Sequence, residues 1–134
     1  LTLAALFTRL EAWARADSSV RAIGLCGSHA RGTARPDSDI DLVIVSRNRH
    51  DLLAERTWIE RFGRPARIGE EDYGLVQSLR VFFDGGLEDE FGLAEPEWCT
   101  PPIDPGTAAV IREGLQPIYD PEGLLARAIE AAQN

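Results

Sequence analysis

The chain has 134 residues, of which 44% are hydrophobic and 27% are charged, as is typical of a globular protein, so we expect a single domain over residues 1–134. With 14 basic and 22 acidic residues its net charge is −8, which argues against the basic stripe that proteins use to follow a long nucleic acid. No apolar run approaches the ~18 residues of a membrane span and no signal-peptide pattern is seen, so we expect a cytoplasmic protein with no membrane partner.

The first predicted elements are a helix and a buried strand. Within residues 1–16 the apolar residues recur at steps of three and four, which predicts a helix with one buried stripe: Leu3, Leu6, Phe7, Leu10, Trp13 and Ala14. Residues 20–26 are almost wholly apolar and predict a strand inside a sheet covered on both faces. Cys26 ends this strand and is expected to pack as a small hydrophobic residue, because two cysteines are too few for a disulfide framework.

A glycine turn and a short helix follow the first strand. Gly27 and Ser28 offer backbone N–H groups and a hydroxyl at a strand end and helix start, where phosphate binds well. Arg31 and Arg35 either contact phosphate or lie on the surface. Ser38 either orients a neighbouring carboxylate or caps the turn that precedes the next strand, and capping is the simpler interpretation.

Two acidic residues open the second predicted strand, residues 40–45. Because strand side chains alternate, Asp39 and Asp41 face one side of the sheet and Ile40 faces the other. Asp41 adjoins a Leu-Val-Ile-Val run that must be core, where an unpartnered carboxylate would cost several kcal/mol or take up a proton. A cation between the carboxylates removes this difficulty, and oxygen ligands of this kind suit Mg²⁺ or Mn²⁺. A phosphate-binding turn beside two carboxylates that bind divalent metal ions is typical of phosphoryl or nucleotidyl transfer.

The middle of the chain predicts one helix and three strands. Leucine, isoleucine and aromatic residues mark a long helix over residues 52–62 that stops at a glycine. Residues 66–68 predict a brief strand, and residues 69–72 a charged loop. Residues 75–83 and 87–94 predict two strands joined by an Asp-Gly hairpin turn.

The C-terminal part predicts a stiff loop and two helices. Residues 95–106 hold four prolines and either rim a pocket or, the interpretation that we favour, carry the chain across the surface. Asp104 caps a helix that runs to residue 113, and a second Asp-Pro pair precedes a last helix over residues 122–132. The predicted fold class is α/β (α+β), with a mixed central sheet of about four to five strands and flanking helices.

Three consecutive acidic residues lie in the predicted strand over residues 87–94. By alternation Glu88 and Glu90 share one face, whereas Asp89 lies on the other face with Leu87 and Phe91. Such a run destabilises a half-buried strand by self-repulsion unless its acids face water or a cation.

The pattern Gly27-Ser28, ten residues, then Asp39-Ile40-Asp41 resembles the hallmark of the DNA polymerase beta-like nucleotidyltransferase superfamily. The fuller match, Gly-Ser-x-Ala-Arg-Gly followed by Ser-Asp-Ile-Asp-Leu, is similar to the minimal and antibiotic-type nucleotidyltransferases. The resemblance implies a nucleotidyltransferase fold and a third carboxylate from a later strand, just before an apolar residue. Glu90 matches this position best, and Glu88 is the alternative.

The resemblance also implies a reaction in which a nucleoside monophosphate moves from a nucleoside triphosphate to a hydroxyl and pyrophosphate leaves. ATP is the first candidate for the triphosphate, so that AMP is transferred, and another NTP is the alternative. Gly27 and Ser28 would hold the phosphates, with Arg31 and Ser38 as further nucleotide-binding candidates. Asp39, Asp41 and Glu90 would bind Mg²⁺ or Mn²⁺, and Glu90 would act as general base.

The acceptor hydroxyl would belong to an aminoglycoside-like or lincosamide-like molecule, or to a tyrosine or serine of a partner protein. Two alternative functions stay open: an antitoxin that modifies a small helical HEPN-type partner, and a catalytically silent nucleotide-binding domain. Antibiotic-modifying relatives usually carry a further helical domain that builds the acceptor site. We therefore expect either that a homodimer partner supplies this part of the site or that the acceptor differs.

Overall fold

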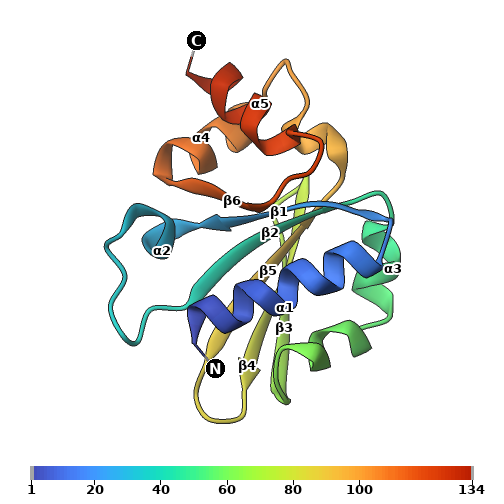
Figure 1. The fold of residues 1–134 in the computed structure, drawn as a ribbon, viewed down its shortest axis with the longest axis vertical. Coiled ribbons are helices and arrows are strands. Elements are labelled where there is room, and N and C mark those ends of the chain that lie inside the picture. The colour runs from blue at the N-terminus through green and yellow to red at the C-terminus, as the bar shows by residue number, and fades with distance from the viewer. Residues whose placement is uncertain (1, 134) are drawn as a thin grey trace.

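A computed structural model describes residues 2–133, in which helices flank a single twisted sheet (Figure 1). The helical segments of this part of the chain are α1 (Leu3–Ala16), α2 (Gly27–Arg31), α3 (Arg49–Ala54), η1 (Thr57–Arg61), η2 (Pro96–Cys99), α4 (Pro105–Glu113) and α5 (Leu124–Ala132), with η marking 3₁₀ helices. The strands are β1 (Val20–Cys26), β2 (Ile40–Ser46), β3 (Pro65–Asp72), β4 (Val76–Phe83), β5 (Glu88–Ala94) and β6 (Leu115–Tyr119).

The sheet has the strand order β3-β4-β5-β2-β1-β6. β2 and β5 are parallel, and every other neighbouring pair is antiparallel. This mixed sheet confirms the predicted fold class, with six strands among the described residues rather than four to five. Its two central strands carry the acidic residues singled out in the sequence, so the candidate site lies mid-sheet.

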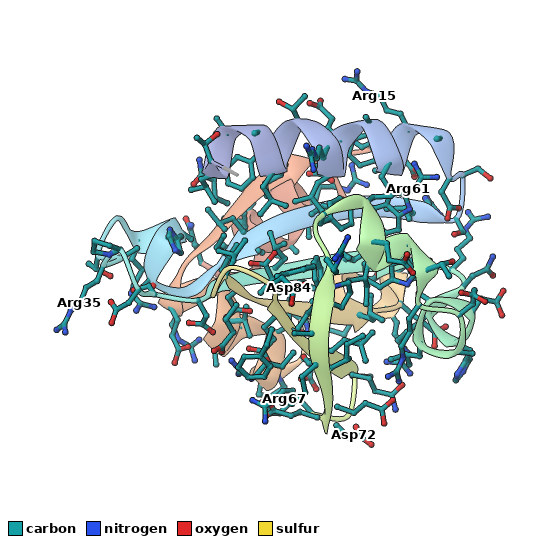
Figure 2. The ribbon with its side chains drawn as sticks, turned by 90° about the horizontal axis from the view of Figure 1, so that it is seen from below. Arg15, Arg35, Arg61, Arg67, Asp72 and Asp84 are labelled. Atoms are coloured by element: carbon teal, nitrogen blue, oxygen red, sulfur yellow. The ribbon has the colours of Figure 1, made fainter. Side chains whose placement is uncertain are left out.

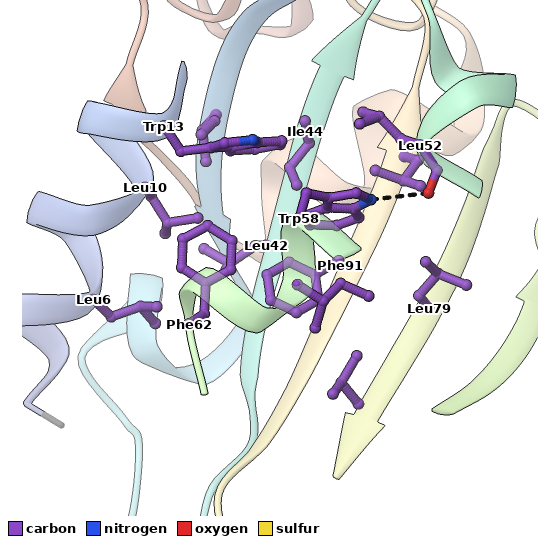
Figure 3. Packing of buried hydrophobic residues seen from close by; sticks show 14 of the residues in the cluster. Leu6, Leu10, Trp13, Leu42, Ile44, Leu52, Trp58, Phe62, Leu79 and Phe91 are labelled. Carbon is purple, nitrogen blue, oxygen red and sulfur yellow. Dashed lines mark hydrogen bonds between the residues drawn. The ribbon is translucent and has the colours of Figure 1, made fainter. Parts of the chain in front are cut away.

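The main hydrophobic core lies between the sheet and α1 with η1 (Figure 3). Trp13 of α1 stacks on Trp58 of η1 with ring centroids 5.1 Å apart, and Trp58 meets Phe91 of β5 edge to face at 5.3 Å. The Trp58 indole N–H donates to the Leu52 carbonyl over 2.9 Å, so its one polar group is satisfied. Leu1, at the start of the predicted N-terminal helix, lies outside the described residues.

A second hydrophobic cluster covers the opposite face of β1 and β2. It joins side chains from the sheet, η2 and α5: Ala22, Cys26, Val43, Val45, Ala94, Trp98, Cys99, Leu125 and Ala128. Cys26 is buried in it as a small hydrophobic residue, as predicted. Within residues 2–133 no helix has the length and apolar character that crossing a membrane requires.

The single long helix predicted over residues 52–62 is wrong. The chain forms α3, breaks, and continues as η1. The Glu55 carboxylate accepts from the Thr57 N–H at 3.0 Å and the Arg56 guanidinium donates to the Leu53 carbonyl at 2.8 Å. These local bonds compete with helical ones and end α3 at Ala54.

Other boundaries also differ from the prediction. Residues 69–72 are not a loop but the second half of β3, because an edge strand can hold acidic side chains that face water. β6 was not predicted, since Pro117 lies within it, which an edge strand tolerates. The last helix begins at Leu124 rather than residue 122, because Gly123 has a φ of 70°. Asp120 still caps it, accepting from the N–H groups of Leu125 and Ala126.

Candidate active site

The glycine turn lies directly against the acidic strand. Gly27 ends the passage from β1 to α2 with a φ of 67°, a left-handed conformation that favours glycine. A Cβ at this position would lie 3.3 Å from the Asp41 Oδ2 atom. Any other residue at position 27 would therefore be strained and would crowd the Asp41 carboxylate. The Gly27 and Ser28 backbone is thus held beside Asp41.

Two of the three acids predicted to bind metal are direct neighbours in the sheet. Asp41 on β2 pairs in register with Glu90 on the parallel strand β5, and Asp39 immediately precedes β2. On its other side Asp41 lies opposite Cys26, where β1 meets the glycine turn. The Glu90 side chain is only 12% exposed, whereas that of Asp39 is 41% exposed. The sheet therefore places the acids in a row that runs from solvent into a partly buried site.

Burial and mutual repulsion perturb these acids. Burial, followed by the carboxylates of Glu90 and Asp39, raises the pKa of Asp41 to about 7. Burial also raises the pKa of Glu90, while the neighbouring Arg80 guanidinium acts in the opposite direction. A site that holds more negative charge than its surroundings compensate favours a cation.

Arg80 lies at the centre of the acidic cluster. It sits opposite Glu90 in the β4–β5 pairing, and its guanidinium donates to four carboxylates. The distances are 3.2 Å to Asp39, 3.1 Å to Glu71 and 3.1 Å to Glu90, and Glu88 makes the fourth contact. Arg80 thus links the two candidate metal ligands Asp39 and Glu90 to two further acids.

The donor set suits a hard divalent cation in chemistry and in strand register. All three candidate ligands are carboxylates, from β2, from β5 and from the residue before β2, and burial together with the Glu90 and Asp39 carboxylates raises the pKa of Asp41, a destabilisation that a cation would relieve. In the arrangement described for residues 2–133, however, no group of three acidic, histidine or cysteine side chains is closed around a position for an ion. The oxygens of Asp39 and Glu90 are directed to Arg80 instead.

A cavity of about 390 Å³ opens beside the acids, between the sheet and α4. Asp41, Glu90 and Ser78 are among its polar lining groups, and Val76, Trp98 and Val110 are among its apolar ones. We favoured the interpretation that the proline-rich loop only carries the chain across the surface, and this is wrong. Trp98 is 3% exposed, and both Trp98 and Asp104 line this cavity.

The side chains of the remaining predicted nucleotide-binding residues, Arg31 and Ser38, make hydrogen bonds to backbone groups rather than to the acids. Arg31 donates to the Glu113 carbonyl at the end of α4 over 2.9 Å. Ser38 accepts from the Arg35 backbone N–H at 2.8 Å, which is the capping arrangement. Figure 2 shows Arg35 at the tip of its loop, pointing into solvent. His29 is partly buried on α2, with a ring nitrogen 3.4 Å from the Ser38 carbonyl oxygen.

Sequence reasoning missed two residues of this site, Arg80 and Ser78. A signal for both was present, because alternation along the β4 segment places Ser78 and Arg80 on one face of the strand, with Gln77 on the other. The antiparallel register then sets Arg80 opposite Glu90 and Ser78 opposite Gly92. Arg80 is the one charged residue of β4, so it needs an acidic partner, and the three acids of β5 were the candidates.

The sheet, the glycine turn and the acidic strand together define a nucleotidyltransferase fold. The sequence model of the Nucleotidyltransferase domain family matches residues 9–90, more than half of the chain, and the chain belongs to this family.

Comparison with solved structures gives matches at low sequence identity, of which the first shares the fold. An aminoglycoside 6-adenyltransferase from Bacillus subtilis superposes with a TM-score of 0.53 and 16% identity, covering 69% of this chain and 34% of that one. The polymerase core of TRAMP, an RNA surveillance complex, gives a TM-score of 0.47 and 14% identity, covering 67% of this chain and 28% of that one. The chain spans about one third of the length of the adenyltransferase. Among curated proteins none matches this chain.

Proposed function

We propose that the chain is a metal-dependent nucleotidyltransferase that moves a nucleoside monophosphate, with AMP from ATP as the first candidate, to an acceptor hydroxyl. One observation supports this most strongly. Asp41 and Glu90 pair in register on parallel strands, at the side of a cavity and against the Gly27 turn. A partly buried pair of carboxylates beside a glycine-serine turn fits phosphoryl chemistry better than a structural role, because it destabilises the fold unless a cation is bound.

Asp39, Asp41 and Glu90 would hold Mg²⁺ or Mn²⁺, and Glu88 is the alternative third ligand. The bound ions would neutralise charge on the triphosphate and orient its α-phosphorus for in-line attack. Gly27 and Ser28 would hold the β- and γ-phosphates through backbone N–H groups and the Ser28 hydroxyl. The Arg31 and Ser38 side chains would contribute only after leaving the bonds that they make to Glu113 and Arg35.

Glu90 is the candidate general base. Its pKa is raised by burial, which makes its carboxylate a better proton acceptor than an exposed glutamate. The acceptor oxygen would form a bond to the α-phosphorus while its proton passes to Glu90. The bond from the α-phosphorus to the bridging oxygen would break, and pyrophosphate would leave.

The cavity is the candidate acceptor site. Its volume of about 390 Å³ is within the range of small-molecule sites, and its lining combines apolar side chains with Asp41 and Glu90. We therefore place a small-molecule hydroxyl first among acceptors, aminoglycoside-like compounds included, ahead of a tyrosine or serine of a partner protein.

The test is pyrophosphate release with each labelled NTP, Mg²⁺ or Mn²⁺, and a panel of aminoglycosides, lincosamides and hydroxyl-bearing peptides. We expect acceptor-dependent release with one nucleotide preferred, and transfer of label to the acceptor. Asp39→Asn should abolish it, whereas Asp37→Asn, at an exposed acid of the same loop, should not. Release that persists at the wild-type rate in Asp39→Asn would contradict the proposal.

A further inference from the structure

Arg80 is held by more acids than its own charge can neutralise. Among residues 2–133 its guanidinium pairs with Asp39, Glu71, Glu88 and Glu90, and no other basic side chain forms an ion pair with any of these four. One positive charge therefore faces four negative ones. Its side chain is 27% exposed, so the cluster is open to water at one side.

The four acids fall into two groups. Asp39 and Glu90 are candidate metal ligands beside Asp41, which forms no ion pair of its own among the described residues. Glu71 lies on the edge strand β3 and Glu88 at the start of β5. Arg80 bridges the groups, so the same carboxylate oxygens that would bind an ion are occupied by guanidinium N–H groups.

We propose that Arg80 is the resident cation of the acidic cluster in the metal-free protein, and that a divalent ion displaces its guanidinium from Asp39 and Glu90. This inference rests on the proposed function, because it assumes the metal site named there. The displaced guanidinium keeps Glu71 and Glu88 as partners. Arg80 is then a positioning residue that stabilises the acids without metal and weakens metal binding by competition.

Competition between Arg80 and the metal ion predicts the direction in which metal affinity changes when Arg80 is removed. If Arg80 only preorganised the acids, its removal would weaken metal binding, because the carboxylates would lose their fixed positions. Under competition its removal tightens metal binding, because the ion no longer breaks two charged hydrogen bonds as it enters. A long-range charge effect also tightens binding, but salt screens it, whereas direct contact is screened much less.

The experiment is a titration of the chain with Mn²⁺, followed by electron paramagnetic resonance in 0.3–0.5 M salt, an ionic strength on the order of that needed to screen distant charges. Arg80→Gln is compared with Arg67→Gln on the neighbouring strand. The Arg67 guanidinium lies 4.2 Å from the centroid of the Phe82 ring, so this control removes one charge of the same type outside the acidic cluster.

We expect Arg80→Gln to bind Mn²⁺ roughly tenfold more tightly than wild type, and Arg67→Gln to change the affinity less than about twofold. Mn²⁺ should also raise the melting temperature of Arg80→Gln more than that of wild type, because the unpaired acids gain more from an ion. Should Arg80→Gln fail to fold, Arg80→Lys serves in its place, with an affinity between wild type and the expected gain, because lysine cannot bridge several carboxylates at once.

Unchanged or weaker Mn²⁺ binding in the folded Arg80 variants would overturn the inference and leave the proposed function standing. Failure of wild type and all variants to bind Mn²⁺ would overturn both. Pyrophosphate release is measured separately, so the two failures are distinguishable.

Discussion

Asp89 and Glu90 are consecutive residues of β5 that face opposite sides of the sheet. Asp89 is fully buried on the α1 side, and neither of its carboxylate oxygens has a hydrogen-bond partner among the described residues. Glu90 faces the cavity and has Arg80 as an ion-pair partner. Burial raises the pKa of both groups, that of Asp89 to about 7. We call the α1 side of the sheet the closed face and the cavity side the open face. Asp89 on the closed face therefore lowers the stability of the fold, whereas Glu90 on the open face can take part in catalysis.

The largest expected effect is on the open face. Asp41→Asn keeps the shape of the side chain but removes a metal-binding charge, so we expect turnover to fall at least ~10³-fold, as is typical of a lost metal ligand or equivalent transition-state contact. The metal-free variant should be more stable than wild type at pH 8, because burial and the Glu90 and Asp39 carboxylates raise the pKa of Asp41 to about 7 and its ionised form at pH 8 therefore destabilises the fold. Activity assays and thermal unfolding check the two parts. Wild-type activity together with lower stability would show that Asp41 belongs to the structure alone.

The matching change on the closed face is Phe91→Ala. Phe91 is fully buried and packs edge to face on Trp58, so its truncation should cost about 3–5 kcal/mol of unfolding free energy. Denaturant unfolding measures this loss. Below the unfolding transition, Mn²⁺ affinity should stay near wild type, because the ring faces away from the acids. A large loss of affinity in the folded variant would mean that the two faces are coupled.

Asp89→Asn tests the cost of the closed-face acid through pH. The raised pKa means that the folded state holds a proton which the unfolded state releases above about pH 4, so wild-type stability should fall between about pH 4 and pH 7. The neutral amide removes this contribution. We expect a gain of about 2–3 kcal/mol at pH 8 and little gain at pH 4, measured by denaturant unfolding at several pH values. An equal effect at both pH values would show that Asp89 is not buried as an unpaired acid.

The smallest effect should come from the far wall of the cavity. Asp104 accepts from the Gly106 N–H at 2.8 Å as the cap of α4, and Asp104→Ala should cost about 1 kcal/mol in thermal unfolding. Since α4 borders the cavity, KM for the acceptor should rise more than kcat falls. A fall in kcat with KM unchanged would instead place Asp104 among the reacting groups.

The local pattern along the chain was enough to predict the central part of the fold. An apolar run predicted β1, the acidic and apolar pattern predicted β2, a hairpin turn predicted β4 and β5, and a capping residue predicted α4. The opposite faces of Asp89 and Glu90 followed from the alternation of side chains along a strand. These features depend on neighbouring residues in the sequence, so the sequence carries them directly.

Other missed features depend on pairing between strands and on contacts between separate segments. β6 exists because it pairs with β1, and the acids of β3 are held extended by pairing with β4. The partners of Arg80 come from two strands, β3 and β5, and from the loop before β2, so the local pattern along any one segment does not show the whole cluster. The acids of the candidate site were predicted from the sequence, but Arg80, the cationic side chain among them, was not.

The most direct measurement is a crystal structure of the chain soaked with Mn²⁺ and a non-hydrolysable NTP analogue, with anomalous data collected for manganese. Our account predicts an anomalous peak bound by Asp39 and Asp41, with Glu90 or Glu88 completing it, the phosphates against Gly27 and Ser28, and Arg80 withdrawn to Glu71. Ordered nucleotide or manganese bound elsewhere, with Arg80 still paired to Asp39 and Glu90, would contradict it.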